Sequence, residues 1–271
     1  MNHPVSSNPE IDNILHGLSV VVIAKNEADR IPGLIESVGF ADEVVVVDSG
    51  SDDGTQAICG RLGARVVFHE WAGYAAQKQF ATSLARYGWI LNLDADEWLS
   101  DSLAVEIQQA IRDAPDSVNG FSMPRLSRYL GRWIRHGGWY PDRKVRLVRN
   151  GAGQWVGSGL HETLEVTGQV ARLNAPILHD VYRNISDQIQ TIDRFSGVYA
   201  EHKTASGWYV VAGCVHAFGK FLECFVYKLG FLDGLPGLII AMNSAWYVFL
   251  KHAKVWERTN WGRQRTEDDT P

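Results

Sequence analysis

Four short apolar runs, alternating with segments of helical composition, constrain the fold of this chain more than any other feature. Residues 18–24 form a continuous β-branched run, which is typical of a strand buried on both faces of a parallel sheet. Runs of the same kind follow at 43–48, 64–69 and 89–94. The segments between them have the character of helices: 28–38, 54–62 and 74–86. This alternation predicts a doubly wound, mostly parallel α/β sheet.

The rhythm changes after the helix predicted near residues 99–111. Further strands are predicted at 120–125, 144–148, 156–166 and 169–177. Helical patterns return at 184–203 and dominate to the end. We therefore expect a polar leader at 1–17 and an α/β domain at 18–182, divided into halves at 18–111 and 112–182. A helical C-terminal region at 183–258 and a polar tail at 259–271 follow.

Composition excludes some classes of protein. With 271 residues, 45% of them hydrophobic, the chain can bury the core of one large domain or of a domain with an appendage. A net charge of −5 argues against a general nucleic-acid binder. The three cysteines have no metal-type spacing, which favours a reducing cytosol. The first eighteen residues contain no apolar segment of the kind found in signal peptides.

The fourth predicted strand ends in two carboxylates, Asp94 and Asp96, separated by one small residue. Open α/β sheets bind their ligands outside the carboxyl ends of the strands. Two carboxylates at one point favour Mg²⁺ or Mn²⁺, which keeps open positions for phosphate oxygens. The alternative is that both acids only cap the helix that follows.

The glycine motifs of the two commonest nucleotide-binding folds are missing. No G-x-G-x-x-G follows the first strand, and the sequence contains no G-x-x-x-x-G-K-[ST] loop. A nucleotide would therefore bind through carboxylates and side-chain amides. Asp48 ends a buried strand and can accept hydrogen bonds from a base or a ribose. For Asp52, Asp53 and Thr55 we favour turn and helix-cap roles.

Four segments together resemble the family 2 glycosyltransferases with the GT-A fold: residues 19–27, 44–55, 77–78 and 93–97. The resemblance covers roughly residues 18–258. The His161-Glu162 pair and residues 228–234 are similar to one group within the family, the WaaE/KdtX-type β-1,4-glucosyltransferases of the lipopolysaccharide inner core.

The resemblance implies an inverting, metal-dependent transfer of a hexose, glucose from UDP-glucose, to a heptose of the lipopolysaccharide inner core. It assigns five residues to the nucleotide sugar: Glu27, Asp48, Gln77, Lys78 and Asp94. It assigns a divalent metal, Mg²⁺ or Mn²⁺, to Asp96.

The general base is a separate assignment. Glu162 is the implied base, and His161 would orient the site or bind the metal. A structural, hydrogen-bonded role is the alternative for His161. The pair His179-Asp180 is a reserve candidate for metal or base.

A basic segment at residues 125–149 is interleaved with aromatic side chains, which stack on sugar rings. Six of its cations are candidates for binding phosphates of the donor or of a phosphorylated acceptor: Arg125, Arg128, Arg132, Arg135, Arg143 and Lys144. The interleaving favours a mobile acceptor lid, and a solvated surface is the alternative.

Residues 218–249 are strongly apolar and are interrupted at residues 233–237 by an acid, glycines and a proline. The longest uncharged run, 234–250, is at the short limit for a membrane span. Flanking lysines fit a segment lying on an anionic bilayer. We expect a pair of helices that are either interfacial, on the inner face of the cytoplasmic membrane, or buried in a core.

Three other functions are compatible with these patterns. A transferase of the same fold would use another lipid-linked or capsular acceptor. A glycoside hydrolase would also use paired carboxylates, without nucleotide or metal. A non-catalytic protein on the membrane surface would bind a nucleotide sugar without turnover.

Overall fold

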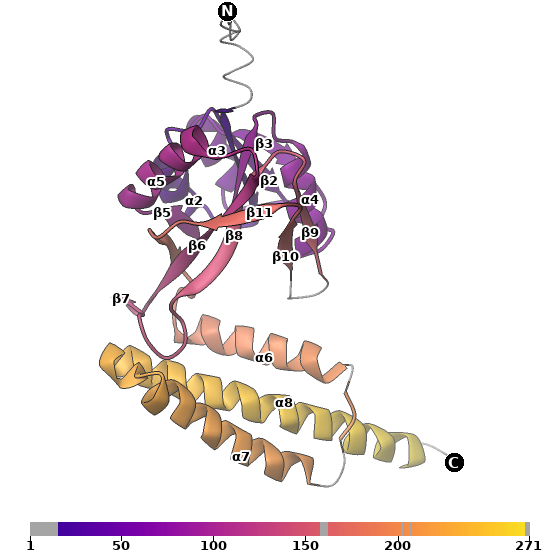
Figure 1. Ribbon diagram of the computed structural model, residues 1–271. Helices are drawn as coiled ribbons and strands as arrows, with labels where there is room; N and C mark the ends of the chain where they lie inside the picture. The colour runs from indigo at the N-terminus through magenta and orange to yellow at the C-terminus, as the bar shows by residue number, and fades with distance from the viewer. Residues whose placement is uncertain (1–15, 158–161, 202, 206–207, 269–271) are drawn as a thin grey trace, which may run out of the picture. The chain divides into compact units, whose positions relative to one another are not determined.

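The computed structural model describes residues 16–157, 162–201, 203–205 and 208–268, with the backbone alone at 261–268. The chain divides into two compact units (Figure 1). The sheet unit comprises Met1–Arg125 and Asp142–His179, and the helical unit comprises Leu126–Pro141 and Asp180–Pro271. The basic segment is therefore divided, because residues 126–141 belong with the C-terminal helices.

Four parallel strands form the first half of the sheet, in the spatial order β3-β2-β1-β4. They are β1 (Leu18–Ala24), β2 (Glu43–Asp48), β3 (Arg65–Phe68) and β4 (Trp89–Asp94). The order reverses between β1 and β4, and such a switch point opens a crevice at the carboxyl ends of the strands. The predicted parallel sheet is confirmed.

The second half of the sheet is mixed. Beyond β4 the order continues β8-β6-β12-β5, with β8 antiparallel to both β4 and β6. The elements are β5 (Glu97–Leu99), β6 (Val118–Tyr129), β7 (Arg132–Trp133), β8 (Asp142–Arg149), β11 (Gln169–Arg172) and β12 (Ile177–Asp180). The strand expected at 156–166 is instead part of a separate antiparallel hairpin, formed by β9 (Gly153–Val156) and β10 (Thr163–Val166).

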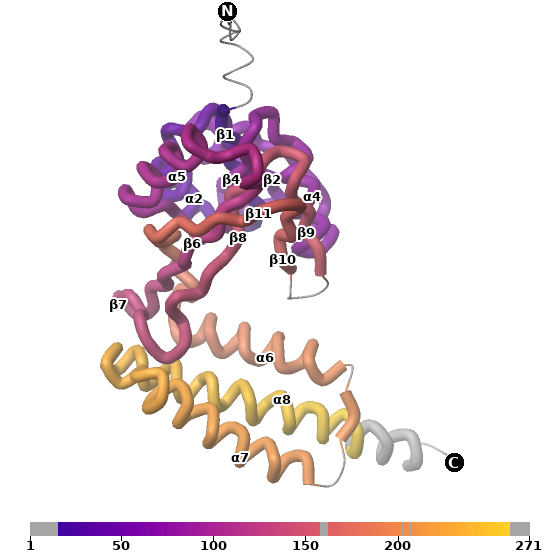
Figure 2. Tube along the Cα trace, viewed as in Figure 1, coloured from indigo at the N-terminus to yellow at the C-terminus, as the bar shows by residue number. Residues whose placement is uncertain are grey.

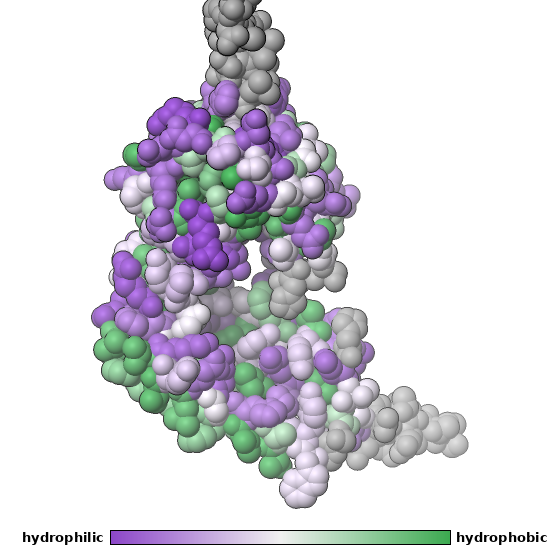
Figure 3. Space-filling view, viewed as in Figure 1, coloured by the Kyte–Doolittle hydropathy of each residue, from purple (hydrophilic) through white to green (hydrophobic). Residues whose placement is uncertain are grey.

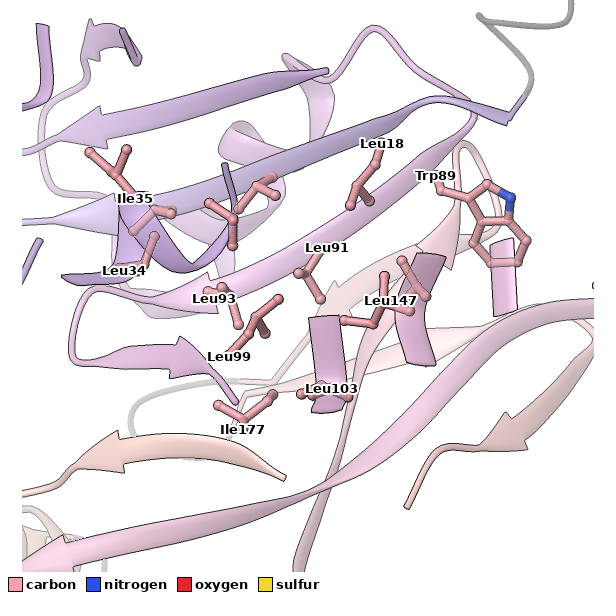
Figure 4. Packing of buried hydrophobic residues seen from close by; sticks show 14 of the residues in the cluster. Leu18, Leu34, Ile35, Trp89, Leu91, Leu93, Leu99, Leu103, Leu147 and Ile177 are labelled. Atoms are coloured by element: carbon pink, nitrogen blue, oxygen red, sulfur yellow. The ribbon is translucent and has the colours of Figure 1, made fainter. Parts of the chain in front are cut away.

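Alternating side chains of β1 reach both faces of the sheet. Val20 and Val22 join one core cluster, with side chains of α2, α3 and α5, while Val21 joins a second cluster, with Ala81 of α4. Figure 4 shows the first cluster, where residues such as Leu34 and Leu103 pack toward the strands. Burial on both faces explains why β1 is an unbroken apolar run. The helices are α2 (Ile31–Ser37), α3 (Thr55–Arg61), α4 (Tyr74–Ser83) and α5 (Asp101–Asp113).

In the helical unit, the long helix α8 packs against both α6 and α7 (Figure 2). The elements are α6 (Ile185–Glu201), α7 (Tyr209–Leu222), the π-helical η1 (Glu223–Tyr227), the 3-10 turn η2 (Gly230–Asp233) and α8 (Gly234–Asp268). The segment predicted to be a polar tail is thus helical as far as Asp268.

A corner of tightly packed backbone joins η1, η2 and α8. A Cβ atom on Gly237 would overlap the carbonyl oxygen of Gly230, and one on Gly230 would collide with the carbonyl of Cys224. Asp233, which is 2% exposed, fixes residues 126–141 to this corner by accepting hydrogen bonds from the backbone amides of Arg135 and His136. We call this arrangement the glycine corner.

An apolar surface covers one side of the helical unit (Figure 3). In α7 the exposed side chains of Val211, Val215, Phe218 and Leu222 recur every three or four residues and so lie on one face. Exposed apolar side chains continue through the glycine corner into α8: Val226, Tyr227, Leu229, Phe231, Leu232, Leu235, Met242 and Trp246. Within the described residues, the stretch Tyr209–Tyr227 alone is long and apolar enough to cross a membrane, judged by length and composition, and 11% of it is buried.

Candidate active site

The predicted acids meet at the carboxyl edge of the parallel strands. Strand register places Asp48 of β2 beside Ala24 of β1, and Asp94 of β4 beside Ile23 of the same strand. Asp48 and Asp94 therefore lie at one edge of the sheet, on the two sides of β1. This is the switch-point crevice in which open α/β sheets bind ligands.

Asp94 is surrounded by positive charge. Its Oδ1 lies 2.7 Å from Nζ of Lys78, and its Oδ2 accepts a hydrogen bond of 2.5 Å from Arg146. Burial alone would raise the pKa of the Asp94 carboxyl, but the charges of Arg146 and Lys78 outweigh it and hold this pKa well below the ordinary range. Both oxygens are engaged by protein cations, so Asp94 is poorly suited to be the principal metal ligand.

A buried carboxylate, Glu97, belongs to the same cluster. Its Oε1 lies 2.8 Å from the guanidinium of Arg146 and 3.1 Å from that of Arg125, and its Oε2 accepts from the backbone N–H of Asp94. Glu97 is fully buried. Burial lowers the pKa of Arg146, but Asp94 and Glu97 raise it on balance, so this guanidinium stays charged. Sequence reasoning assigned no role to Arg146 or Glu97.

The second acid, Asp96, has different surroundings. Its Oδ2 lies 3.4 Å from Nε2 of His179 and 3.7 Å from the guanidinium of Arg30. His179 belongs to β12 and pairs with Glu97 of β5, so the pairing of these two strands brings the imidazole to the Asp-x-Asp motif. The reserve candidate His179 is therefore a neighbour of the predicted metal ligand.

The Asp96–His179 pair fits a divalent cation. Two neighbouring ligands at about 2.1 Å from an octahedral ion lie about 3 Å apart, close to the 3.4 Å between these atoms. In the part of the chain that the structure describes, no group of three or more His, Cys, Asp or Glu side chains is placed to hold a metal. Mg²⁺ and Mn²⁺ are usually held by one or two carboxylates together with substrate phosphates and water, so Asp96 supplies the usual type of ligand and His179 an additional nitrogen.

Glu162, the predicted base, joins the Asp94 cluster through Lys78. Its Oε1 lies 3.0 Å from Nζ of Lys78, whose side chain is 7% exposed. Trp155 of β9 covers this lysine, with Nζ 4.8 Å from the centre of the indole ring. The structure thus brings Lys78, Asp94 and Glu162 together from three separate parts of the chain. His161 lies outside the described residues.

Two predicted nucleotide ligands are occupied by internal hydrogen bonds. Asp48 is fully buried, and its Oδ1 accepts from the backbone amides of Gly50 and Ser51 at 2.9 Å each. Gln77 is also fully buried; its Nε2 donates to Oγ of Ser49 and to the carbonyl of His69. These bonds hold the loop after β2 in place. Contact of either side chain with a nucleotide stays a prediction.

The loops after β1 and β2 are tied to each other. Asp53 accepts from the backbone amides of Ala28 and Thr55, and Oγ1 of Thr55 accepts from the amide of Glu27. Asp53 therefore has the turn role expected from the sequence, whereas the expected helix cap is not formed by a side chain: Gly54 is the N-cap of α3, and Thr55 binds the loop after β1. The backbone of Glu27 is thereby fixed at the edge of the crevice, and its side chain lies 3.7 Å from Arg30.

The six predicted phosphate-binding cations do not form one cluster within either unit. In the sheet unit, Arg125 and Lys144 pair with Asp142, and Arg143 donates to the carbonyl of Leu173. In the helical unit, Arg128 pairs with Asp180, and Arg132 donates to the carbonyl of Leu232. Arg135 lies over the ring of Tyr140. Most of these cations are thus engaged by protein groups.

A mixed sheet with a parallel 3-2-1-4 half, an Asp-x-Asp motif at its switch point and a helical C-terminal unit defines a glycosyltransferase of the GT-A class. The chain belongs to glycosyl transferase family 2, whose family model matches residues 19–161. The suspected family and the enzyme class are confirmed.

Several relatives match most of the chain. The lipopolysaccharide core biosynthesis glycosyltransferase LpsC of Rhizobium meliloti is 31% identical, over 89% of this chain and 92% of its own length. An uncharacterized glycosyltransferase of Rickettsia bellii is 30% identical, over 89% of this chain and 86% of its own length. Among solved structures, Mycobacterium tuberculosis glucosyl-3-phosphoglycerate synthase with Mn²⁺, UDP and phosphoglyceric acid is similar at 17% identity and a TM-score of 0.46, covering 70% of this chain and 79% of that one.

Proposed function

We propose that this protein is an inverting transferase that moves a hexose, glucose from UDP-glucose, to a heptose of the lipopolysaccharide inner core. The contact between Asp96 and His179 carries the proposal, because it gives the Asp-x-Asp motif a place for a metal. Asp94, whose two oxygens are paired with Lys78 and Arg146, is then left to face the nucleotide sugar. The lipopolysaccharide relative supports the acceptor class.

Asp96 and His179 are the proposed ligands of Mg²⁺ or Mn²⁺. When bound, such a cation stabilises the charge that develops on the departing diphosphate. Arg30, which lies 3.7 Å from both Asp96 and Glu27, is placed to add a second positive charge near the same phosphates. Asp48, Glu27, Gln77, Lys78 and Asp94 form the proposed walls of the nucleotide-sugar site.

Lys78 has a defined task in this proposal. It holds Asp94 on one side and Glu162 on the other, and the indole of Trp155 shields it from water. Glu162 then takes the proton from the attacking hydroxyl of the acceptor, on the face of the sugar opposite to the leaving group. A single displacement of this geometry inverts the anomeric configuration, so an α-linked donor gives a β-linked product.

The apolar surface of the helical unit is the proposed contact with the inner leaflet of the cytoplasmic membrane. A lipid-linked acceptor is presented at a bilayer, and a helix face with apolar side chains binds in the interfacial plane. The support is the periodic, exposed face of α7 and its continuation into α8. Glu223 pairs with both Lys220 and Lys228, so it offsets one of these two positive charges.

The reaction is tested by UDP release from a panel of UDP-sugars, with Mn²⁺, with Mg²⁺ and with EDTA. We expect metal-dependent release from UDP-glucose that truncated lipopolysaccharide core stimulates. Release without stimulation by the core would contradict the acceptor, and turnover that survives EDTA would contradict the metal. Binding of UDP and Mn²⁺ without turnover on any acceptor would favour a non-catalytic protein.

A further inference from the structure

A cavity of about 150 Å³ lies within the helical unit, between α6 and α8. Four aromatic side chains from different segments line it: Trp139, Tyr182, Phe195 and Tyr247. The cavity is partly open to solvent, and a volume of this size accepts one six-membered ring. None of the residues proposed for the donor or the metal lines it, so the cavity is not part of the active site described above.

Two amide side chains give the cavity a polar side. Gln188 is 4% exposed, and its Oε1 accepts hydrogen bonds of 2.5 Å from both Oη of Tyr129 and Nδ2 of Asn243. The second hydrogen-bonding atom of each amide, Nε2 of Gln188 and Oδ1 of Asn243, has no partner among the residues described by the structure. A ligand in the cavity would find one donor and one acceptor already fixed in position.

No charged residue is among those that line the cavity. Burial raises the pKa of both Tyr182 and Tyr247, so their phenols are neutral and able to donate near pH 7. Thr191 and Ser244 add two hydroxyl groups. Lys251 and Arg194 stack on the rings of Tyr247 and Phe195 but do not line the cavity, so a phosphate or a carboxylate would have no charged lining residue to pair with.

The ligand that best fits this lining is an uncharged ring with one apolar face and several hydroxyls. Aromatic walls suit the C–H face of such a ring, while amides and hydroxyls pair with its edge. An acyl chain would satisfy the aromatic walls but would cover Nε2 of Gln188 and Oδ1 of Asn243 without offering either atom a hydrogen bond, which is unfavourable. A sugar in pyranose form meets both requirements.

We propose that this cavity is a subsite for one uncharged pyranose unit of the saccharide acceptor. The proposal rests on the proposed function only in taking the acceptor to be a saccharide. It makes Trp139, Gln188 and Asn243 acceptor-binding residues, for which no role was assigned above.

The test is saturation-transfer NMR on the full-length protein with three separate probes: deacylated, truncated lipopolysaccharide core, uridine and decanoate. We expect transfer to ring protons of the core saccharide. Asn243→Leu removes one amide at similar volume, and Ser244→Phe fills the cavity. Each variant should raise the dissociation constant of the saccharide about tenfold or more, the usual effect of losing a buried polar contact.

Asn260→Leu is the matched control, because Asn260 lies on the same helix, is exposed, and donates to the carbonyl of Trp256. Circular dichroism and retained binding of UDP with Mn²⁺ show that each variant is folded. Transfer to uridine or decanoate that both variants abolish, or saccharide binding that neither variant changes, would overturn the subsite.

The two proposals fail separately. Saccharide binding that is lost in both variants, with no UDP release from any donor, would retain the subsite and reject the proposed reaction. Core-stimulated UDP release with saccharide binding unaffected by either variant would reject the subsite and retain the reaction.

Discussion

Nε2 of His179 lies 3.4 Å from Oδ2 of Asp96, although the two residues are far apart in the sequence. The pairing of β12 with β5 produces this contact, since His179 stands opposite Glu97, the neighbour of Asp96. The two acids of the Asp-x-Asp motif thus have different partners: protein cations for Asp94, and an imidazole and a more distant guanidinium for Asp96.

Replacing either member of this pair should weaken metal binding. We expect Asp96→Ala to abolish metal-dependent turnover with the fold intact. His179→Ala should raise the dissociation constant of Mn²⁺ at least about tenfold, since even partners outside the coordination shell contribute that much. Electron paramagnetic resonance of Mn²⁺ with UDP measures both, with Asp116→Ala as the exposed control. Unchanged Mn²⁺ affinity in both variants would remove the metal assignment.

Glu162→Gln should separate binding from transfer. The amide keeps the shape of the side chain but accepts no proton, so transfer should fall by a factor of about 10² or more while UDP still binds. Single-turnover assays together with UDP calorimetry measure the two effects. Glu165→Gln, on the exposed side of β10, should behave as wild type. If Glu162→Gln retains full transfer, Asp180, which pairs with Arg128, becomes the next candidate.

Arg146→Met should destabilise the sheet unit strongly. The variant leaves Glu97 fully buried with only Arg125 as a cationic partner, and breaking a buried ion pair in this way costs about 3–5 kcal/mol. Urea unfolding measures the change in the free energy of unfolding. The half-exposed Lys144 is the control, and Lys144→Met should change this free energy by less than about 1 kcal/mol. Equal effects of the two substitutions would contradict the buried network.

Stability at acid pH should depend on Asp94. Its pKa is lower in the folded protein than in the unfolded chain, so the unfolded chain takes up a proton first as the pH falls. The stabilisation by Asp94 is complete above the ordinary aspartate range and is lost progressively below it, by up to about 1.4 kcal/mol per pH unit for one proton. Urea titrations from pH 6 down to about pH 2.5 should show a shallower dependence for Asp94→Asn. A slope equal to that of wild type would mean that the pKa of Asp94 is the same in the folded protein and in the unfolded chain.

The apolar surface should bind lipid. Replacing Phe231, Leu235 and Trp246 together by Ser should release the protein from anionic vesicles in a flotation assay, because these exposed side chains supply interfacial contact area. The control replaces the exposed Phe68 and Val105 of the sheet unit by Ser and should leave flotation unchanged. Flotation that survives the triple substitution would mean that the protein binds lipid through another surface.

Local pattern was sufficient for the parallel strands. The bounds predicted for β1, β2 and β4 agree with the structure to the residue, because strands buried on both faces appear as unbroken β-branched or apolar runs. Asp94 and Asp96 were recognised for the same reason, since a polar pair is conspicuous at the end of such a run.

The partners of these acids were harder to predict. Arg146 looked like one of many cations in a basic segment, and only the antiparallel pairing of β8 with β4 places it next to Asp94. His179 was identified only as a reserve candidate, because the contact with Asp96 depends on a three-residue strand, β5, that has no sequence signature of its own. Long-range strand pairing decides such contacts, and no local pattern encodes it.

The glycine corner sets opposite rules for substitutions only two residues apart. At position 237 any side chain would drive two backbone segments apart, whereas Leu235 is 74% exposed and meets no such restriction. In a saturation library selected only for folded protein, position 237 should return glycine while position 235 returns nearly every amino acid. The proposed affinity for lipid can therefore be tuned by substitution at position 235 without rebuilding the turn next to it.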